Sequence, residues 1–335
     1  MLSPTKSVLL IYRKQYNYTY SIEFIFDQIV KELQPLQSIK KHNLPFYSNS
    51  LFNRLFNIVS ILLLPGKILH VTGDVHYVVL GAWFKLRILT IHDLAFMHQN
   101  IGIKRSILKW FYIILPVKFA HRVTVISHST KYDLLNYVAV DPQKIQVIPN
   151  FISKCFQADL DRKFNTEQPI ILQVGTAFNK NIERLAEAIS GLNCELIIIG
   201  ELNKLQVASL QKFKVNYFSK TGLSEQELLS EYANADLLAF VSTIEGFGMP
   251  ILEAQACGLP IVTSNCSSMP EVAGDAAIFV DPQNIKSIRN GILELISNQN
   301  LRNDLIQKGF ENVKRFSKEK VVAQYKVLYQ ELSKL

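Results

Sequence analysis

Two glutamates eight positions apart, Glu245 and Glu253, are the residues of this 335-residue sequence best placed to do chemistry. Between them lie two glycines, Gly246 and Gly248, and a proline, Pro250. Glycine lets a backbone come close to a ligand because it has no Cβ, and proline suits the first position of a helix. The pattern predicts a turn followed by a short helix whose first N–H groups bind an anion.

Carboxylates beside an anion-binding helix start are unexpected if the ligand is only a phosphate. They are expected if the ligand carries hydroxyl groups on both sides of its phosphates, as a nucleotide sugar does, because one carboxylate accepts from two neighbouring hydroxyls. The alternative is a helix start with two solvated acids. The glycines and proline between the acids, and the strand patterns on both sides, favour the ligand site.

A longer run around these glutamates resembles the group 1, family four glycosyltransferases of GT-B fold. The run, from Thr221 to Pro282, reads TGLSEQELLSEYANADLLAFVSTIEGFGMPILEAQACGLPIVTSNCSSMPEVAGDAAIFVDP. The resemblance is looser but continuous over most of the remaining chain. It implies an α/β protein with two Rossmann-like domains whose parallel sheets face across a cleft. It also implies transfer of a sugar from a nucleotide-diphosphate sugar to a hydroxyl, with retained configuration and without a cofactor or catalytic metal.

The resemblance assigns roles to residues that follow predicted strands. Glu245 would hold the hydroxyls of the donor sugar, and Glu253 would hold the ribose. Lys180, in the loop after the predicted strand 169–175, would stabilise the departing diphosphate. The family typically places an arginine beside this lysine, and the loop 176–181 has none. The residues expected to contact the donor are Gly175, Thr176, Lys180, Gly200, Glu245, Gly246, Phe247, Gly248, Met249 and Glu253.

In the N-terminal half, the resemblance points to His92. This histidine ends the predicted strand 86–92 in a T-x-H-D pattern, where the family places a histidine close to the donor sugar. With Glu245 and Lys180 it completes the expected catalytic set. The family's first strand–helix loop usually carries glycines, whereas here the loop 13–20 holds basic residues and three tyrosines. These either contact the acceptor or anchor a surface loop.

Composition bounds the class of protein. With 48% hydrophobic and 19% charged residues, the chain is globular and long enough for two domains. None of its four cysteines forms a C-x-x-C pair, so neither a zinc site nor a disulfide framework is expected and a reduced, cytoplasmic setting fits. No histidine spacing matches a zinc site. The Asp159-Leu160-Asp161 pattern, typical of metal-dependent transferases, follows no predicted strand and is interpreted as chance.

Charge is unevenly distributed along the sequence. Residues 1–150 contain 17 Lys and Arg against 7 Asp and Glu, a net charge of +10, whereas the rest of the chain has −2. The N-terminal half is therefore expected to face an acidic partner, namely an anionic membrane or a phosphorylated lipid acceptor. No nucleic-acid-binding motif appears. The expected partners are a nucleotide-diphosphate sugar, a glycan or lipid-linked acceptor, and the cytoplasmic face of a membrane.

Two apolar stretches of the N-terminal half are flanked by basic residues. The stretch 44–67 has apolar residues at helical spacing, and 101–122 mixes three lysines and two arginines with aromatic side chains. Both could lie in a membrane interface. The alternative is a helix packed on the sheet, which is favoured for the first stretch. For the second, packing with lysines that reach out to water competes with the interface.

The sequence predicts an N-terminal domain over residues 1–150, a polar linker over 151–168 and a nucleotide-sugar-binding domain over 169–315. By resemblance, the helix in 316–335 would cross back to the first domain. Two alternatives to a transferase with a lipid-linked or polysaccharide acceptor remain open. One is a GT-B relative that binds a nucleotide or glycan without turnover, and the other is a transferase that acts on a soluble phosphorylated sugar.

Overall fold

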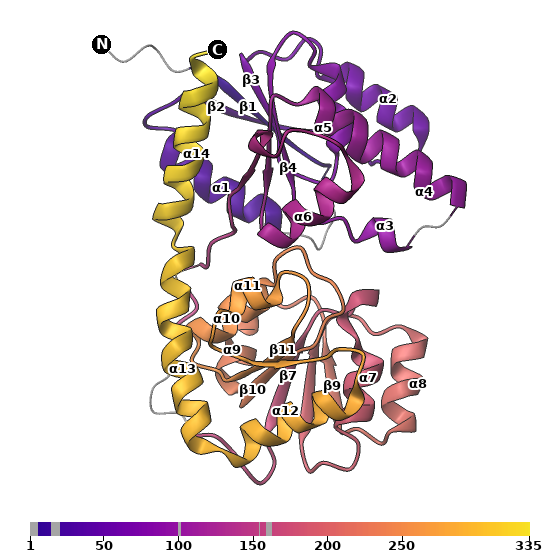
Figure 1. Cartoon of the computed structure of the whole chain (residues 1–335), viewed down its shortest axis with the longest axis vertical. Helices are drawn as coiled ribbons and strands as arrows, with labels where there is room; N and C mark the ends of the chain where they lie inside the picture. The colour runs from indigo at the N-terminus through magenta and orange to yellow at the C-terminus, as the bar shows by residue number, and fades with distance from the viewer. Residues whose placement is uncertain (1–5, 15–20, 100–101, 154, 159–162) are drawn as a thin grey trace. The chain divides into compact units, whose positions relative to one another are not determined.

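A computed structural model of the chain describes residues 6–14, 21–99, 102–153, 155–158 and 163–335 (Figure 1). It divides into two compact units. Unit 1 comprises residues 1–151 and 318–335, and unit 2 comprises residues 152–317. Each unit contains one six-stranded sheet in which all neighbouring strands are parallel. The predicted α/β class with two parallel sheets is confirmed.

The sheet of unit 1 has the strand order β2-β1-β3-β4-β5-β6. Its strands are β1 (Val8–Tyr12), β2 (Ile39–Asn43), β3 (Ile68–Val71), β4 (Leu86–Ile91), β5 (Arg122–Val125) and β6 (Ile145–Val147). β1 and β3 are buried along their whole length, as expected of apolar runs inside a parallel sheet. β2 lies at the edge and reads IKKHN with mostly exposed side chains, which explains why the apolar pattern did not predict it.

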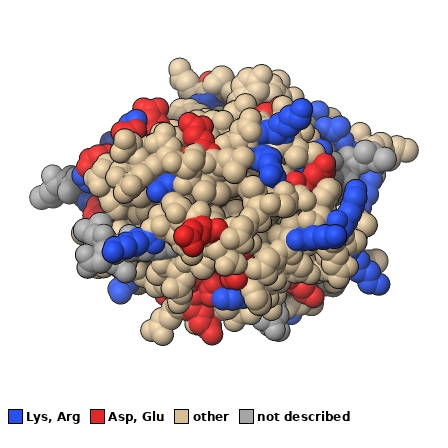
Figure 2. All heavy atoms as spheres, turned by 90° about the horizontal axis from the view of Figure 1, so that it is seen from below, with Lys and Arg blue, Asp and Glu red and all other residues tan. Residues whose placement is uncertain are grey.

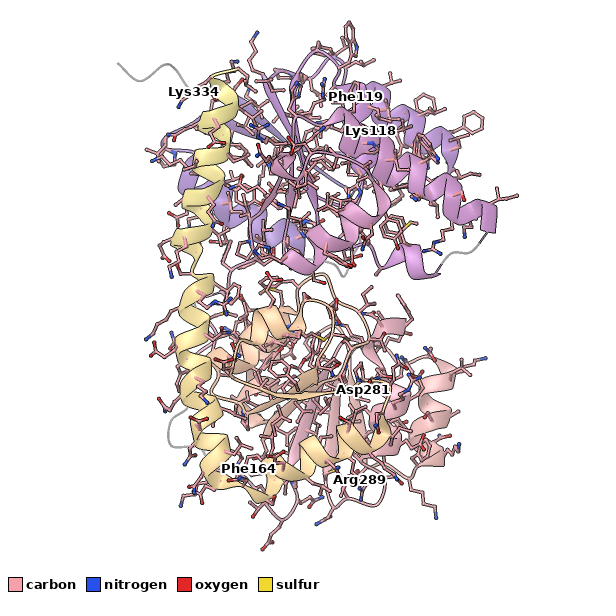
Figure 3. All side chains as sticks on the ribbon, in the orientation of Figure 1. Lys118, Phe119, Phe164, Asp281, Arg289 and Lys334 are labelled. Carbon is pink, nitrogen blue, oxygen red and sulfur yellow. The ribbon has the colours of Figure 1, made fainter. Side chains whose placement is uncertain are left out.

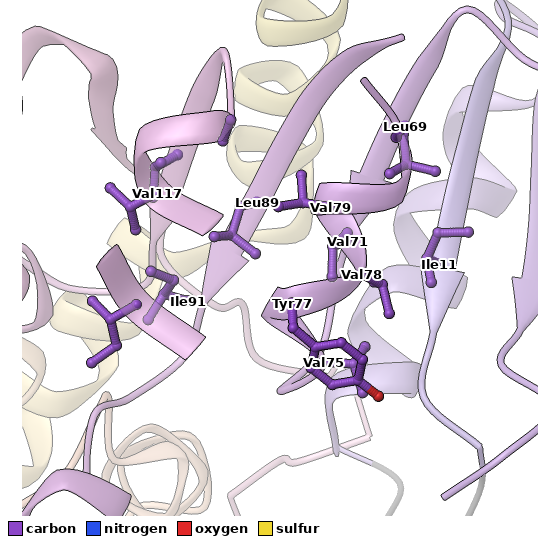
Figure 4. Close-up of a cluster of buried hydrophobic side chains, with 14 of the residues drawn as sticks. Ile11, Leu69, Val71, Val75, Tyr77, Val78, Val79, Leu89, Ile91 and Val117 are labelled. Carbon is purple, nitrogen blue, oxygen red and sulfur yellow. The ribbon is translucent and has the colours of Figure 1, made fainter. Parts of the chain in front are cut away.

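Helices cover both faces of this sheet. The α-helices of unit 1 are α1 (Ser21–Leu33), α2 (Leu51–Ser60), α3 (Phe96–Gln99), α4 (Gly102–Leu108), α5 (Leu115–Phe119), α6 (His128–Tyr137) and α14 (Lys318–Ser333). Unit 1 also contains two 3-10 helices, η1 (His76–Gly81) and η3 (Pro142–Lys144), and a π-helix, η2 (Lys109–Ile114). One core cluster joins the sheet to α1 and α14, and another joins it to η1, η2 and α5 (Figure 4).

The last helix, α14, is tied to the sheet of unit 1 by a chain of buried polar groups. The imidazole of His70 on β3 lies 2.8 Å from the hydroxyl of Tyr329 on α14 and 2.7 Å from that of Thr90 on β4. The Thr90 hydroxyl lies 2.6 Å from that of Thr124 on β5. Burial lowers the pKa of His70 to about 3, so this imidazole is neutral. The C-terminal segment therefore belongs to the packing of unit 1.

The sheet of unit 2 has the order β12-β11-β10-β7-β8-β9. Its strands are β7 (Ile170–Val174), β8 (Glu195–Ile199), β9 (Tyr217–Lys220), β10 (Leu237–Phe240), β11 (Ile261–Ser264) and β12 (Ile278–Val280). The α-helices are α7 (Ile182–Ala188), α8 (Lys204–Lys212), α9 (Glu225–Asn234), α10 (Met249–Ala256), α11 (Met269–Ala273), α12 (Ile285–Ser297) and α13 (Gln299–Val313). On α12, Arg289 donates to the carbonyls of Ala188 and Ser190 and fastens the end of α7 (Figure 3).

The described parts of the predicted linker, 151–168, are bonded to neighbouring structure. The amide of Ile152 donates to the carbonyl of Phe316, and the amide of Asn165 donates to the carboxylate of Asp236. The guanidinium of Arg302 lies 4.0 Å from the ring centre of Phe164. The two aspartates of the D-x-D pattern, residues 159 and 161, lie outside the described residues.

The stretch 44–67 was predicted as one helix, but only 51–60 is helical. Ser50 caps its start by accepting from the amide of Asn53, and the chain leaves the helix through a turn that reaches Pro65 and Gly66. The favoured interpretation, an apolar face packed on the sheet, is wrong for this helix, because most of its apolar side chains are exposed. The second stretch is divided among α4, η2 and α5.

Candidate functional site

The candidate site lies in unit 2 where the order of strands reverses. β7 has β8 on one side and β10 on the other, so the chain leaves the ends of β7 and β10 in different directions. Ligands of open parallel sheets bind beyond the carboxyl ends of strands at such a switch point. The loop 175–181 follows β7 and the loop 241–248 follows β10, which brings most of the predicted donor residues to one place.

Lys180 and Glu245 form an ion pair that joins these two loops. The Nζ atom of Lys180 lies 2.7 Å from Oε1 of Glu245, and the side chains are only 14% and 13% exposed. The amide group of Asn179 donates to the same carboxylate oxygen at 3.1 Å and to the carbonyl of Ile244 at 2.7 Å. Lys180 Nζ also lies 4.4 Å from the ring centre of Phe240. The cation is thus held in one position before any ligand arrives.

Two serines after β11 fix the backbone of the glutamate loop. The amide of Glu245 donates to the hydroxyl of Ser267, which donates to the carbonyl of Glu245 at 2.7 Å. The hydroxyl of Ser268 lies within hydrogen-bond distance of the carbonyls of Glu245 and Phe247. Asn181, at φ 60°, adds a side-chain bond to the carbonyl of Val241. The loop is therefore preorganised.

Two glycines make room beside Lys180. Gly175 has φ 90°, and a Cβ there would lie 2.7 Å from Cε of Lys180. Gly200 has φ 136°, and a Cβ there would lie 2.9 Å from the side chain of Thr176. Both positions require glycine because the backbone is left-handed and the side chain opposite is in contact.

α10 begins directly after the glutamate loop. Gly248, at φ 105°, is its N-cap residue and has no side chain to cap the first N–H groups. Pro250 lies in the first turn, where a missing N–H costs nothing. The side chain of Phe247 is buried and packs edge-on against Phe316, so only its backbone can face a ligand. The N–H groups of this helix start favour an anion.

Glu253 lies one turn into α10 and is held by α9. The hydroxyl of Tyr232, a fully buried residue, donates to Oε2 of Glu253 at 2.5 Å. Burial raises the pKa of Glu253 to about 7, while the Tyr232 hydrogen bond and the charge of Lys180 lower it. This carboxyl group is therefore balanced between its neutral and ionised forms near neutral pH.

In unit 1, His92 lies in a pocket of about 430 Å³ beyond the ends of β3 and β4. Its Nε2 lies 2.7 Å from the carbonyl of Thr72, so Nε2 carries the proton. Burial lowers the pKa of His92, and the neutral ring keeps Nδ1 as a hydrogen-bond acceptor. Other polar side chains that line the pocket are Arg13, Ser48, Asn49, Asp74, His76, Asp93 and Tyr112.

The comparisons with known proteins place the chain in a family. The model described as "Glycosyl transferases group 1" matches residues 158–312, and the model described as "Glycosyltransferase Family 4" matches residues 39–154. The chain belongs to the group 1, family 4 glycosyltransferases. The group 1 match lies in unit 2 and contains the Lys180–Glu245 pair. The family 4 match lies mostly in unit 1 and contains His92.

Three similar proteins illustrate this glycosyltransferase family. The O-antigen chain mannosyltransferase B of Escherichia coli is 39% identical over 31% of this chain and 28% of its own length. Sucrose-phosphate synthase from Thermosynechococcus elongatus, 17% identical, superposes with a TM-score of 0.81 over 98% of this chain and 99% of that one. Anabaena Alr3699/HepE in complex with UDP-glucose, 13% identical, has a TM-score of 0.76 over 98% and 100%.

The curated relatives match only part of their own length, whereas the solved structures match nearly the whole chain. The chain spans 28 to 59% of the length of the first three curated relatives it matches. The solved structures are similar over nearly the whole chain and share its fold, which is the GT-B fold. The predicted family and fold are confirmed.

The structure gathers the predicted donor residues at one sheet edge in unit 2, whereas His92, the remaining residue of the expected catalytic set, lies in unit 1. Sequence reasoning missed Asn179, Tyr232 and the bracing roles of Ser267 and Ser268. The two Asn residues beside Lys180 offered a signal, because Asn favours loops and tolerates positive φ. Tyr232 offered none, since its position opposite Glu253 depends on how α9 packs. Among the described residues, no cluster of three His, Cys, Asp or Glu side chains could hold a metal.

Proposed function

We propose that this glycosyltransferase moves a sugar from a nucleotide-diphosphate sugar to a hydroxyl of a glycan acceptor, with retained anomeric configuration and without a metal. The observation that carries the proposal is the Lys180–Glu245 pair at 2.7 Å, at the strand switch point beside the start of α10. A cation for a leaving group and a carboxylate for sugar hydroxyls stand next to each other there.

The positive charge that the reaction needs is supplied by the protein. As the bond to the sugar breaks, negative charge grows on the diphosphate. The ammonium of Lys180 and the N–H groups at the start of α10 stabilise that charge, and both are fixed in advance. Glu245 accepts hydrogen bonds from the sugar hydroxyls, and Glu253 accepts them from the ribose diol. A diphosphate competes with Glu245 for Lys180, which leaves this carboxylate available to the sugar.

The glycan acceptor binds in the pocket of unit 1 that contains His92. His92 and His76 each donate one ring nitrogen to a backbone carbonyl, at 2.7 and 2.9 Å, and burial lowers both pKa values. Each neutral ring therefore presents an acceptor nitrogen. Asp74 and Asp93 add carboxylates. Arg13, the one lysine or arginine among the described residues that line the pocket, already contacts Glu23 and Asp74. Such a pocket suits hydroxyl donors, so a neutral sugar is favoured over a phosphorylated one.

The product class follows from the relatives. Curated relatives include mannosyltransferases named for O-antigen chains, which suggests a growing polysaccharide or its lipid-linked precursor as the acceptor. A solved structure with UDP-glucose suggests a nucleotide-sugar donor. The retained configuration rests on the family resemblance.

The experiment that tests the proposal measures release of nucleoside diphosphate from a panel of nucleotide sugars, with neutral glycans and lipid-linked glycans as acceptors. We expect release with at least one pair, loss of it in Glu245→Ala, and a product whose anomeric configuration by NMR equals that of the donor. Donor binding without release for every acceptor would instead identify a binding protein. Release in the Glu245→Ala variant at the wild-type rate would contradict the site.

A further inference from the structure

α2 presents its apolar face outward. Its exposed side chains include Leu51, Phe52, Leu55, Phe56 and Val59, and Phe52 is 75% exposed. They recur at spacings of three and four residues and so form one stripe along the helix. An amphipathic helix of a globular protein normally turns such a stripe toward the core. Here the stripe faces away from it.

A buried polar side chain fixes this orientation. Asn57, on the opposite side of α2, is fully buried. Its amide group donates to the carbonyl of Phe46 at 2.9 Å and to the hydroxyl of Tyr77 at 3.0 Å, while its oxygen accepts from the amide of Phe46. Rotating the helix to bury the stripe would break these bonds and expose Asn57. The outward stripe is thus a property of the fold.

Neighbouring segments extend the apolar area. Lys85 donates to the carbonyls of Leu64 and Gly66, which holds the 83–84 turn against the chain that leaves α2. The side chains there are also exposed, with Leu63 at 95% and Trp83 at 69%. At the other end of α2, Arg54 lies 5.5 Å from the ring centre of Tyr112 on η2. We call α2, the 83–84 turn and the exposed side chains of 103–110 the α2 surface.

The segment 103–110 contributes both apolar and basic groups. Ile103, Ile107 and Trp110 are exposed. Lys104 and Arg105 are exposed beside them on α4, and Lys118 is exposed on α5 (Figure 3). A tryptophan among lysines and arginines is the composition found where helices meet lipid head groups.

Basic residues far outnumber acidic ones in the part of the sequence that contains the α2 surface. Residues 33–132 contain 12 Lys and Arg but only two acids, Asp74 and Asp93, both of which line the pocket of unit 1. The face shown in Figure 2 differs, because both basic and acidic side chains are scattered over it. Within the described residues, no helix is both long and apolar enough to cross a bilayer. Attachment through this surface would therefore be peripheral.

We propose that the α2 surface docks on an anionic lipid surface, with the apolar side chains entering the head-group region and the surrounding lysines and arginines facing the lipid phosphates. Apolar area and positive charge together match an anionic bilayer. A second copy of the chain is a poorer occupant, because two surfaces with the same excess of positive charge would repel each other. This inference goes beyond the transfer reaction and does not depend on it.

The test is co-sedimentation of the full chain with vesicles of phosphatidylcholine alone and with an equimolar mixture of phosphatidylcholine and phosphatidylglycerol. We expect binding to the mixed vesicles that weakens as salt rises. The double variant Phe52→Ser, Phe56→Ser should bind roughly tenfold more weakly or worse. Lys104→Glu should weaken binding roughly fivefold or more. Exposed positions tolerate such changes, so the fold is retained.

The matched controls lie in unit 2. Phe218, 52% exposed on β9, is changed to Ser, and Lys286 on α12 is changed to Glu; neither should alter vesicle binding. Absence of wild-type binding to the mixed vesicles would overturn the proposal. So would equal binding by the α2-surface variants, or equal binding to both kinds of vesicle. A wild-type dimer in sedimentation that the Phe52→Ser, Phe56→Ser variant converts to a monomer, without vesicle binding, would assign the surface to a second copy.

Discussion

At the scale of single residues, Lys180 and Glu245 balance one another in a site that is mostly shielded from water. A buried ion pair contributes little to stability, since loss of solvation offsets much of the attraction. Its presence at a strand switch point is better explained by ligand binding than by folding. Each partner is held ready for a different part of the ligand.

Gly175→Ala tests whether Lys180 needs the space that this glycine leaves. The new Cβ would displace the lysine side chain, and the alanine would have to adopt the left-handed φ of Gly175. We expect a loss of stability of about 1 kcal/mol from backbone strain and a clear loss of affinity for nucleoside diphosphate, measured by calorimetry. Gly191→Ala is the control, because Gly191 has φ 72° and open space around its Cβ position. Equal affinities in both variants would mean that Lys180 does not bind the diphosphate.

His92 should act as a neutral hydrogen-bond acceptor. Because burial lowers its pKa below the ordinary value of about 6.5, the neutral ring persists as the pH falls to that value. At saturating donor, kcat should therefore stay level between pH 8 and about 6.5, and His92→Ala should lower it roughly tenfold to hundredfold. An acid limb in kcat at or above pH 6.5 that disappears in His92→Ala would contradict this assignment.

At the scale of secondary-structure elements, the packing of α9 against α10 sets the state of Glu253. Tyr232 comes from α9, whose start is fixed by a capping box of Ser224 and Glu227. Burial raises the pKa of Glu253, and the hydrogen bond from the Tyr232 hydroxyl on α9 is the largest effect that lowers it. Helix packing thus adjusts a group expected to bind the ribose.

Tyr232→Phe should shift the pH dependence of nucleoside diphosphate binding to higher pH. The pKa of Glu253 is about 7 in the wild type, so affinity should rise as the pH increases through 7 and the carboxylate forms. Without the tyrosine hydroxyl the pKa rises further, and the gain in affinity should move to higher pH. Calorimetric titrations across this range give the answer. Tyr132→Phe, at an exposed position of unit 1, should behave as wild type, whereas a pH-independent affinity in all three proteins would exclude Glu253 as a ribose ligand.

The elements that could be predicted are those whose residues agree with a local rule. Apolar runs predicted β4 and β7 to within about two residues, and the glycine–proline pattern predicted the start of α10. β2 was missed because an edge strand can be polar. The orientation of α2 was also missed, since Asn57 looks like any polar residue until its partners Phe46 and Tyr77 are in place. Contacts between distant segments decided both cases.

At the scale of the whole molecule, the two units are built from different parts of the chain, and the last helix belongs to the first unit. α14 contributes Val321, Tyr325, Leu328, Tyr329 and Leu332 to the core cluster that also contains α1. Each unit thus has its own core, and each should respond separately to a change in that core.

Leu328→Ala should destabilise unit 1 selectively. This fully buried leucine leaves a cavity when shortened, which costs about 2 to 5 kcal/mol. In scanning calorimetry we expect the midpoint temperature of the unit 1 transition to fall. The midpoint of the unit 2 transition, identified because nucleoside diphosphate raises it, should not change. Leu335→Ala, at an exposed terminal position, is the control and should change neither transition. A downward shift of the ligand-sensitive transition in Leu328→Ala would contradict separate cores.

In the proposed donor site, Lys180 binds the diphosphate and Glu245 binds the sugar. Calorimetric titration with both nucleoside diphosphate and the intact nucleotide sugar tests these separate roles most directly. We predict that Lys180→Met weakens binding of both ligands by roughly tenfold to hundredfold. Glu245→Gln should weaken binding of the nucleotide sugar alone, because it removes a contact to the sugar and frees Lys180 for the diphosphate. Equal losses for both ligands in Glu245→Gln, or unchanged binding in Lys180→Met, would contradict the proposed donor site.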